Sequence, residues 1–145
     1  MLIRTGDTIG VMYRTYEDCK PLTSLLRSSG IPFQFIKKGS EWSLLKPGIK
    51  IVSAHSSKGL EFDTVIIPNL EDNIYPYNPF NIDSEEIDNV LEIDRKLLYV
   101  AMTRARKSLY MFCNRSNKSR FISEIKSSLY EKCTFSSRNS GFIKI

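Results

Sequence analysis

The fold is decided by the stretch Ile51-Val-Ser-Ala-His-Ser-Ser-Lys-Gly-Leu-Glu-Phe-Asp-Thr-Val-Ile-Ile-Pro68, in which two apolar segments enclose small and polar residues. The second segment, residues 64–68, shows no polar alternation, which is typical of a strand buried on both faces of a parallel sheet. The first segment, residues 49–54, predicts another strand that ends just before the polar connection.

Outward from this stretch, strand and helix patterns alternate along the chain. A first helix is expected to start at Asp18 and end at Gly30, with Leu22, Leu25 and Leu26 on its apolar side. A second is expected to start at Ser84, where Glu85 and Glu86 suit the positive end of the helix dipole. The remaining predicted elements are strands at 8–15, 33–36 and 109–113, and a last helix carrying Phe121, Ile122, Ile125 and Leu129.

Alternating strands and helices predict an α/β fold with a mainly parallel sheet and helices on its faces. A chain of 145 residues fits one domain, which we expect to cover residues 1–133, followed by a polar tail at 134–145 that frays. No apolar run approaches the ~20 residues that span a bilayer, so no membrane association is expected. Three widely spaced cysteines predict free thiols in a reducing cytoplasm rather than disulfides or a metal site.

The charges are unevenly distributed along a chain whose formal net charge is +5. Residues 71–94 hold eight acids and no base, whereas residues 104–145 hold ten bases and two acids. A basic C-terminal third suits an anionic partner such as a nucleic acid. A solvated surface explains the same charges equally well.

Polar residues follow two of the predicted strands, at the edge of the sheet where α/β proteins bind ligands. Arg14 lies just past the first strand, and the stretch from His55 to Glu61 lies just past the third, so both are expected at this edge. A guanidinium suits phosphate, a carboxylate suits a ribose hydroxyl, and Gly59 lets a backbone come close. Each also has a structural explanation: an ion pair for Arg14, a structural hydrogen bond for His55 and a turn cap for Glu61. Spacing alone leaves the function open.

Three segments, in order, resemble motifs IV, V and VI of the UvrD/Rep/PcrA group of superfamily 1 helicases. They are Met-Tyr-Arg-Thr (residues 12–15), Ser-Ala-His-Ser-Ser-Lys-Gly-Leu-Glu-Phe-Asp (53–63) and Arg-Lys-Leu-Leu-Tyr-Val-Ala-Met-Thr-Arg-Ala (95–105). The resemblance covers about residues 8–113. It implies a RecA-like three-layer sandwich, related to P-loop NTPases, that forms the second motor domain of an ATP-dependent DNA helicase.

The resemblance also implies roles for single residues. Arg14 would reach the γ-phosphate of ATP, with Tyr13 near the adenine, and Arg104 would be the arginine finger. Glu61 would bond the ribose next to Gly59. The residues implied to touch the backbone of single-stranded DNA are Ser53, His55 and Ser56.

The departures from the family pattern are informative. No Gly-x-x-x-x-Gly-Lys-[Ser/Thr] loop is present, and no Asp-Glu pair follows a strand to hold Mg²⁺. ATP and Mg²⁺ are therefore expected to be held mainly by an N-terminal RecA-like domain of a longer helicase, and this chain alone is expected to be inactive. Only residues 31–48 separate Gly30 from Ile49, where larger members insert an accessory domain. Lys96 replaces the second arginine that is usual in motif VI.

Two other function classes stay open from the sequence. The chain could be a stand-alone, non-catalytic nucleic-acid-binding module that kept the helicase fold. It could also be a protein-interaction domain that docks through the acidic stretch at 71–94. The first alternative predicts DNA affinity that falls with added salt, and the second predicts none.

Overall fold

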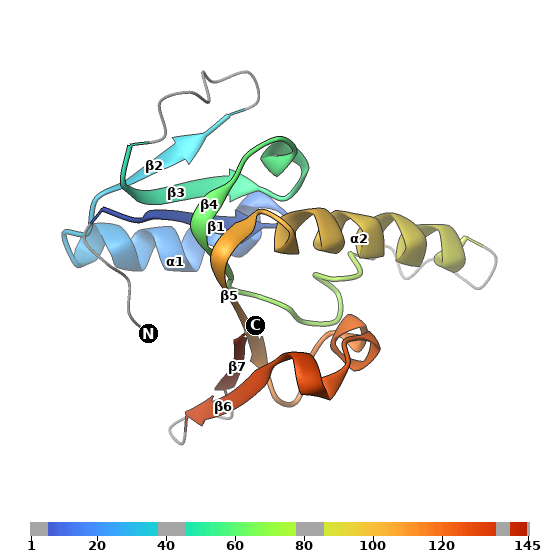
Figure 1. Cartoon of the computed structure of the whole chain (residues 1–145). Helices are drawn as coiled ribbons and strands as arrows, with labels where there is room; N and C mark the ends of the chain where they lie inside the picture. Colours follow the sequence, from blue (N-terminus) through green and yellow to red (C-terminus); the bar gives the residue numbers. More distant parts are fainter. Residues whose placement is uncertain (1–5, 38–45, 78–85, 136–139, 145) are drawn as a thin grey trace.

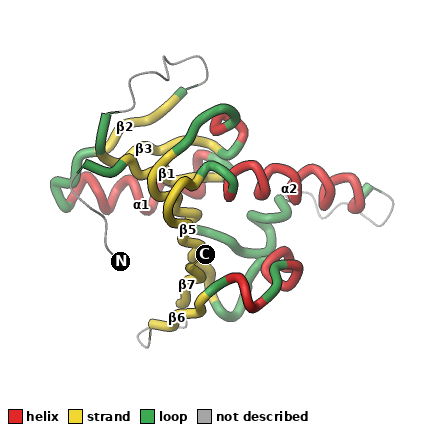
Figure 2. The backbone as a smooth tube through the Cα atoms, viewed as in Figure 1, coloured by secondary structure: helices red, strands yellow, loops and turns green. Residues whose placement is uncertain are grey.

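The computed structural model describes residues 6–37, 46–77, 86–135 and 140–144. Within these ranges, one sheet contains seven strands in the order β2-β3-β1-β4-β5-β7-β6 (Figures 1 and 2). The first five run parallel, and β7 and β6 are antiparallel to their neighbours. The strands are β1 Thr8–Tyr13, β2 Phe33–Ile36, β3 Gly48–Ser53, β4 Phe62–Ile67, β5 Ala105–Asn114, β6 Glu131–Phe135 and β7 Ser140–Lys144.

Two helices, α1 (Tyr16–Ser28) and α2 (Ile87–Met102), lie on opposite faces of the parallel part of the sheet. α1 leads from β1 toward one edge of the sheet, whereas α2 leads from β4 toward the other edge. Because crossovers between parallel strands are right-handed, opposite directions of travel place the helices on opposite faces. The result is the predicted three-layer α/β sandwich.

Successive residues of each central strand feed two separate cores. In β4, Val65 packs on the α2 side with Leu98, whereas Ile66 packs on the α1 side with Val11 and Ile51. Burial of each such side chain contributes roughly 1.5–3 kcal/mol. This two-sided burial explains why residues 64–68 lack polar alternation.

The start of α1 differs from the prediction. Thr15, not Asp18, is the N-cap residue, and Asp18 occupies the third helical position. Its carboxylate accepts hydrogen bonds from the Thr15 backbone N–H and hydroxyl, both at 2.7 Å, which satisfies a donor that would otherwise be orphaned. Leu25, expected on the apolar side, is 61% exposed.

The last predicted helix is wrong. Two short 3-10 helices, η3 (Arg120–Glu124) and η4 (Ser127–Leu129), replace it, and Ile125 lies between them. Their i→i+3 bonds turn the chain more tightly than an α-helix does, so the four apolar residues form no single stripe. Phe121 and Ile122 are buried, whereas Leu129 is 60% exposed.

The expectation of a fraying tail at 134–145 is also wrong where the structure describes the chain. Thr134 and Phe135 end β6, and β7 pairs with β5 from Tyr110↔Lys144 to Asn114↔Ser140. β6 and β7 therefore extend the parallel sheet with an antiparallel pair of strands. The predicted helix start at Ser84 lies outside the described residues, and the described α2 has Glu86 as its N-cap residue.

Neither of the two described α-helices is long and apolar enough to cross a membrane.

Candidate functional site

Arg14 forms an ion pair with Asp94 at the carboxyl edge of the parallel sheet. β1 ends at Tyr13, and the Arg14 side chain turns to the middle of α2, where its Nη2 lies 2.9 Å and its Nε 3.2 Å from Asp94 Oδ1. The Tyr77 backbone N–H donates to the other carboxylate oxygen, and the Tyr77 ring lies 5.1 Å from the guanidinium carbon. The Asp94 side chain is 2% exposed and that of Arg14 14%. Arg14 Nη1 donates no hydrogen bond to a described residue.

His55 begins the short helix η2 (His55–Ser57), which follows β3 at the same edge. Partial burial lowers the pKa of His55, the positive charge of Arg14 lowers it further, and Asp94 opposes both effects. His55 is therefore neutral at pH 7 and can donate or accept one hydrogen bond at each ring nitrogen.

Ser53 and Ser56 hold η2 against the end of β3. Their hydroxyl oxygens lie 2.9 Å apart, and the Ser56 backbone N–H donates to Ser53 Oγ at 3.1 Å. Tyr13 is half-buried and packs against the core under α1, on the opposite face from Asp94. Burial raises the pKa of its hydroxyl, so Tyr13 stays a neutral aromatic residue.

Glu61 does not lie at the predicted edge. Ile9 pairs with Thr64, so Glu61 precedes the level of Thr8, at the amino end of β1. Because parallel strands all start at one edge, the chain must return there after β3, and residues 54–61 make that crossing. The two ends of β1 are roughly 17 Å apart. The stretch from His55 to Glu61 thus connects the two edges instead of lying at one.

Arg104 lies on the Glu61 side and is anchored by three hydrogen bonds. Its Nε donates to the Val100 carbonyl at 3.0 Å, its Nη1 to the Leu60 carbonyl at 3.2 Å and its Nη2 to Thr103 Oγ1 at 3.0 Å. The side chain of Glu61 and the left-handed Gly59 (φ +85°) are exposed on either side of Leu60.

α2 connects the two groups of residues. The Arg14 side chain ends at Asp94 and that of Arg104 at Val100, six residues further along, or about 9 Å along the helix axis. The structure therefore brings Arg14 together with His55, and Arg104 with Gly59 and Glu61.

Asp94 and Tyr77 are missing from the sequence-based site. A signal for Asp94 is present, because it shares the helical spacing of the apolar residues Leu91, Leu98 and Ala101. A carboxylate within an apolar stripe is expected to have a buried partner.

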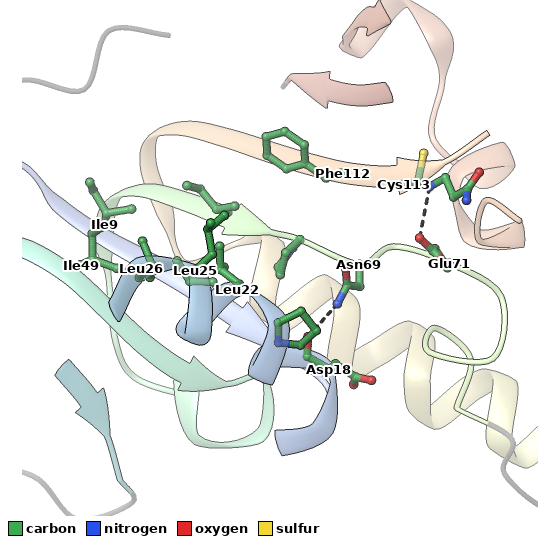
Figure 3. A pocket seen from close by; sticks show the side chains of 15 residues that line it. Ile9, Asp18, Leu22, Leu25, Leu26, Ile49, Asn69, Glu71, Phe112 and Cys113 are labelled. Carbon is green, nitrogen blue, oxygen red and sulfur yellow. Dashed lines mark hydrogen bonds between the residues drawn. The ribbon is translucent and has the colours of Figure 1, made fainter. Parts of the chain in front are cut away.

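A separate apolar hollow of about 660 Å³ lies between α1 and the uncovered parts of β4 and β5 (Figure 3). Leu22, Ile66 and Phe112 contribute apolar walls, and Asp18 and Glu71 bring the only charges among the described lining residues. No Lys or Arg is found among these described lining residues, which does not suit a triphosphate. In the ranges that the structure describes, no cluster of His, Cys, Asp and Glu is arranged to hold a metal ion.

Comparison with curated proteins finds relatives among DNA helicases. The chain is 34% identical over 106 residues to a probable DNA helicase II homolog of Rickettsia conorii, covering 66% of this chain and 16% of that protein. It is 34% identical over 107 residues to the ATP-dependent DNA helicase PcrA of Staphylococcus epidermidis, covering 67% and 14%. The chain thus spans about a sixth or less of the length of these relatives.

Among solved structures, the chain resembles the C-terminal domain of a possible DNA helicase from Lactobacillus plantarum. The TM-score is 0.60 at 24% sequence identity, and the match covers 85% of this chain and 65% of that one. The likeness supports the RecA-like fold. The sequence also matches the profile of the UvrD-like helicase C-terminal domain over residues 37–116, more than half of the chain. The chain therefore belongs to the UvrD-like helicase C-terminal domain family.

Proposed function

We propose that this chain is the second motor domain of an ATP-dependent DNA helicase and completes an ATP site that a P-loop-containing RecA-like domain mainly builds. That partner domain holds ATP and Mg²⁺, and this chain alone is inactive. The observation that carries the proposal is the anchoring of Arg14 and Arg104 on one helix. Each arginine has five donors, and neither uses all of them within the described chain.

In this proposal, the phosphates of ATP lie along α2 between the two guanidinium groups. Arg14 contacts the γ-phosphate, and Arg104 stabilises the charge that develops on the transferring phosphoryl group. Because their anchor points on α2 are ~9 Å apart, one of the two arginines must leave its present hydrogen-bond partners before both can contact a single phosphoryl group. Glu61 bonds the ribose beside Gly59. Tyr13 lies at the opposite end of β1, roughly 17 Å away, so the adenine contact that the resemblance implies for it is not part of this proposal.

The DNA contacts in this proposal come from Ser53, His55 and Ser56. Two hydroxyl groups and a neutral imidazole can bond phosphate oxygens without reading bases. Closure on the partner domain, and reopening after hydrolysis, would alternately strengthen and weaken the binding of single-stranded DNA. By analogy to the family, the motor would move in the 3′-to-5′ direction. Such a motor works in the cytoplasm, where its cysteines stay reduced.

The test joins this chain to the P-loop domain of a relative, either by mixing or by fusion, and measures DNA-stimulated ATP hydrolysis. Arg104→Ala is expected to leave ATP binding intact and to lower turnover by roughly 10³-fold or more. Arg106→Ala is the matched control, because Arg106 lies two residues away and pairs with Asp63.

Equal turnover in the Arg104 and Arg106 variants would exclude Arg104 as the finger. ATP hydrolysis by the 145-residue chain without a partner would exclude the division of labour. If the chain binds DNA and no P-loop domain restores hydrolysis, the non-catalytic binding module is the better description.

A further inference from the structure

Some bases of the basic C-terminal third form ion pairs with a carboxylate of the domain, and others do not. Arg106 and Lys107 both pair with Asp63, and Arg120 pairs with Asp72. These three cations are neutralised within the domain and are poor candidates for binding an anion.

Other bases of this third have no carboxylate within 4 Å among the described residues, and three of them are Arg115, Lys118 and Lys132. Arg115 and Lys118 lie in the turn after β5, and Lys132 lies in β6. All three are exposed. Lys132 lies 5.3 Å from the centre of the Tyr130 ring, a contact that holds the charge without neutralising it.

These three bases line one hollow of about 670 Å³, which we call the basic hollow. Arg120 also lines it, and none of the described lining residues is Asp or Glu. Hydroxyl groups of Ser123 and Thr134 add neutral hydrogen-bonding groups. Because the bases come from two segments of the chain, the positive charge is spread along the hollow and suits several phosphates in a row.

The basic hollow lies at the carboxyl end of β5. β3, which carries Ser53 and precedes His55, is parallel to β5 and ends at the same edge, with β1 and β4 between them. Three strand spacings are about 14 Å. η3, which contributes Arg120 and Ser123 to the hollow, also packs its Phe121 into the core under α2. η3 and α2 therefore lie on the same face of the sheet (Figure 1).

We propose that the basic hollow binds the sugar–phosphate backbone of a DNA strand, as a second contact beyond Ser53, His55 and Ser56. The choice of DNA as the polymer rests on the proposed function. Arg115, Lys118 and Lys132 each neutralise one phosphate, and the contact is independent of base sequence. Loss of three contacts on single-stranded DNA is expected to lower the slope of log affinity against log salt by about 2.

The experiment uses the 145-residue chain and a fluorescent oligothymidylate, with anisotropy measured over a range of salt concentrations. The test variant carries Arg115→Gln, Lys118→Gln and Lys132→Gln. The control carries Lys20→Gln, Arg27→Gln and Lys96→Gln, which remove the same charge from the two α-helices. The test variant is expected to bind at least tenfold more weakly at about 50 mM salt, whereas the control keeps most of the affinity and the slope.

Equal affinity and slope in the two triple variants would overturn the proposal. Circular dichroism checks folding, and single Arg115→Gln, at an exposed turn position, provides the comparison if the triple variant unfolds. If inorganic tripolyphosphate competes as well as the oligonucleotide at equal phosphate concentration, the basic hollow is a small-anion site and the strand proposal is wrong.

His55→Ala separates this proposal from the proposed function. Weaker binding in His55→Ala with no effect in the basic-hollow variant would support the family contact and overturn the new one. The reverse pattern would support the basic hollow and remove His55 from the DNA site. Absence of binding by the unaltered chain at low salt would overturn both.

Discussion

Arg14 and Asp94 are 80 residues apart in the sequence and form an ion pair that ties the end of β1 to the middle of α2. The Tyr77 backbone N–H donates to the second oxygen of the same carboxylate, so three segments meet at Asp94. A cation and an N–H group replace the water that this deeply buried carboxylate loses on folding. The pair therefore stabilises the fold and also orients the arginine that we propose for the γ-phosphate.

Asp94→Asn should destabilise the chain, because Arg14 would keep its charge without a counterion. Removing one partner of a buried pair costs about 3–5 kcal/mol, and the partial exposure of Arg14 favours the lower end. Urea unfolding of both chains measures the difference. Glu92→Gln is the control, since Glu92 pairs with Lys96 on the exposed face of α2 and its loss costs at most about 0.5 kcal/mol.

The double variant Arg14→Met/Asp94→Asn isolates the pair itself. We expect the two changes to be non-additive by at least about 1 kcal/mol, with the double variant more stable than the sum predicts. Additive losses would show that Asp94 acts through Tyr77 and packing instead of through Arg14.

His55 should titrate below the ordinary histidine pKa, and its neighbours should shift it in opposite directions. Arg14→Met is expected to raise the pKa of His55 by removing a positive charge, and Asp94→Asn to lower it further. Since His55 is the only histidine in the chain, NMR titration of its ring reports directly. A shift of the same sign in both variants would contradict the shared electrostatic environment.

The lowered pKa of His55 has a defined effect on stability. Between the folded and unfolded pKa values, the unfolded chain binds more protons than the folded chain, so the free energy of unfolding decreases as pH falls below about 6.5. His55→Gln should remove this part of the pH dependence while leaving the acid transition at lower pH in place.

The parallel part of the fold could be predicted because its information is local. Residues 64–68 are apolar without polar alternation. The residues that connect Ile51 to this segment are too polar and too few to form a buried helix. β2 was predicted at its observed bounds, and β3 and β4 within two residues at each end. The antiparallel β6 and β7 were missed because their polar sequence resembles a tail, and pairing with β5 overrides that weak local preference.

The candidate site could be predicted only in part, for a related reason. Arg14 and His55 follow strands, and strand ends in a parallel sheet share an edge, so their proximity could be inferred. Asp94 was predicted only as the end of the acidic stretch at 71–94, a candidate docking surface, because its partner Arg14 is 80 residues away. Glu61 was placed at the wrong edge because the length of the connection from Ala54 does not reveal where it crosses the sheet.

Asp63 should make the fold sensitive to acid. Its carboxylate accepts hydrogen bonds from the Thr8 backbone N–H and hydroxyl, both at 2.9 Å, and pairs with Arg106 and Lys107. The Thr8 N–H makes the largest contribution to a pKa well below the usual range. The stabilisation is therefore complete above the unfolded pKa near 3.9 and is lost as pH falls through the folded pKa.

Asp63→Asn should lower the free energy of unfolding at pH 7, and its deficit should shrink as pH falls below about 4. Equilibrium unfolding of the two chains at several pH values measures both. Asp88→Asn, at an exposed position in the first turn of α2, is the control and should show no comparable pH dependence. If the loss in free energy of unfolding stayed constant down to low pH, Asp63 would stabilise the fold through its shape and not through its charge.

Gly10 allows β1 and β4 to pack closely, and Gly10→Ala should destabilise the domain. A Cβ at this position would lie 2.7 Å from two ring atoms of Phe62, and this ring is fully buried and has no room to move away. Overpacking of this kind costs about 1–3 kcal/mol, measurable by urea unfolding. Phe62→Leu should itself destabilise the chain, but adding Gly10→Ala to it should cost much less than in the native background, because the smaller side chain leaves room. An equal cost of Gly10→Ala in both backgrounds would assign the effect to the backbone of β1 and not to the Phe62 ring.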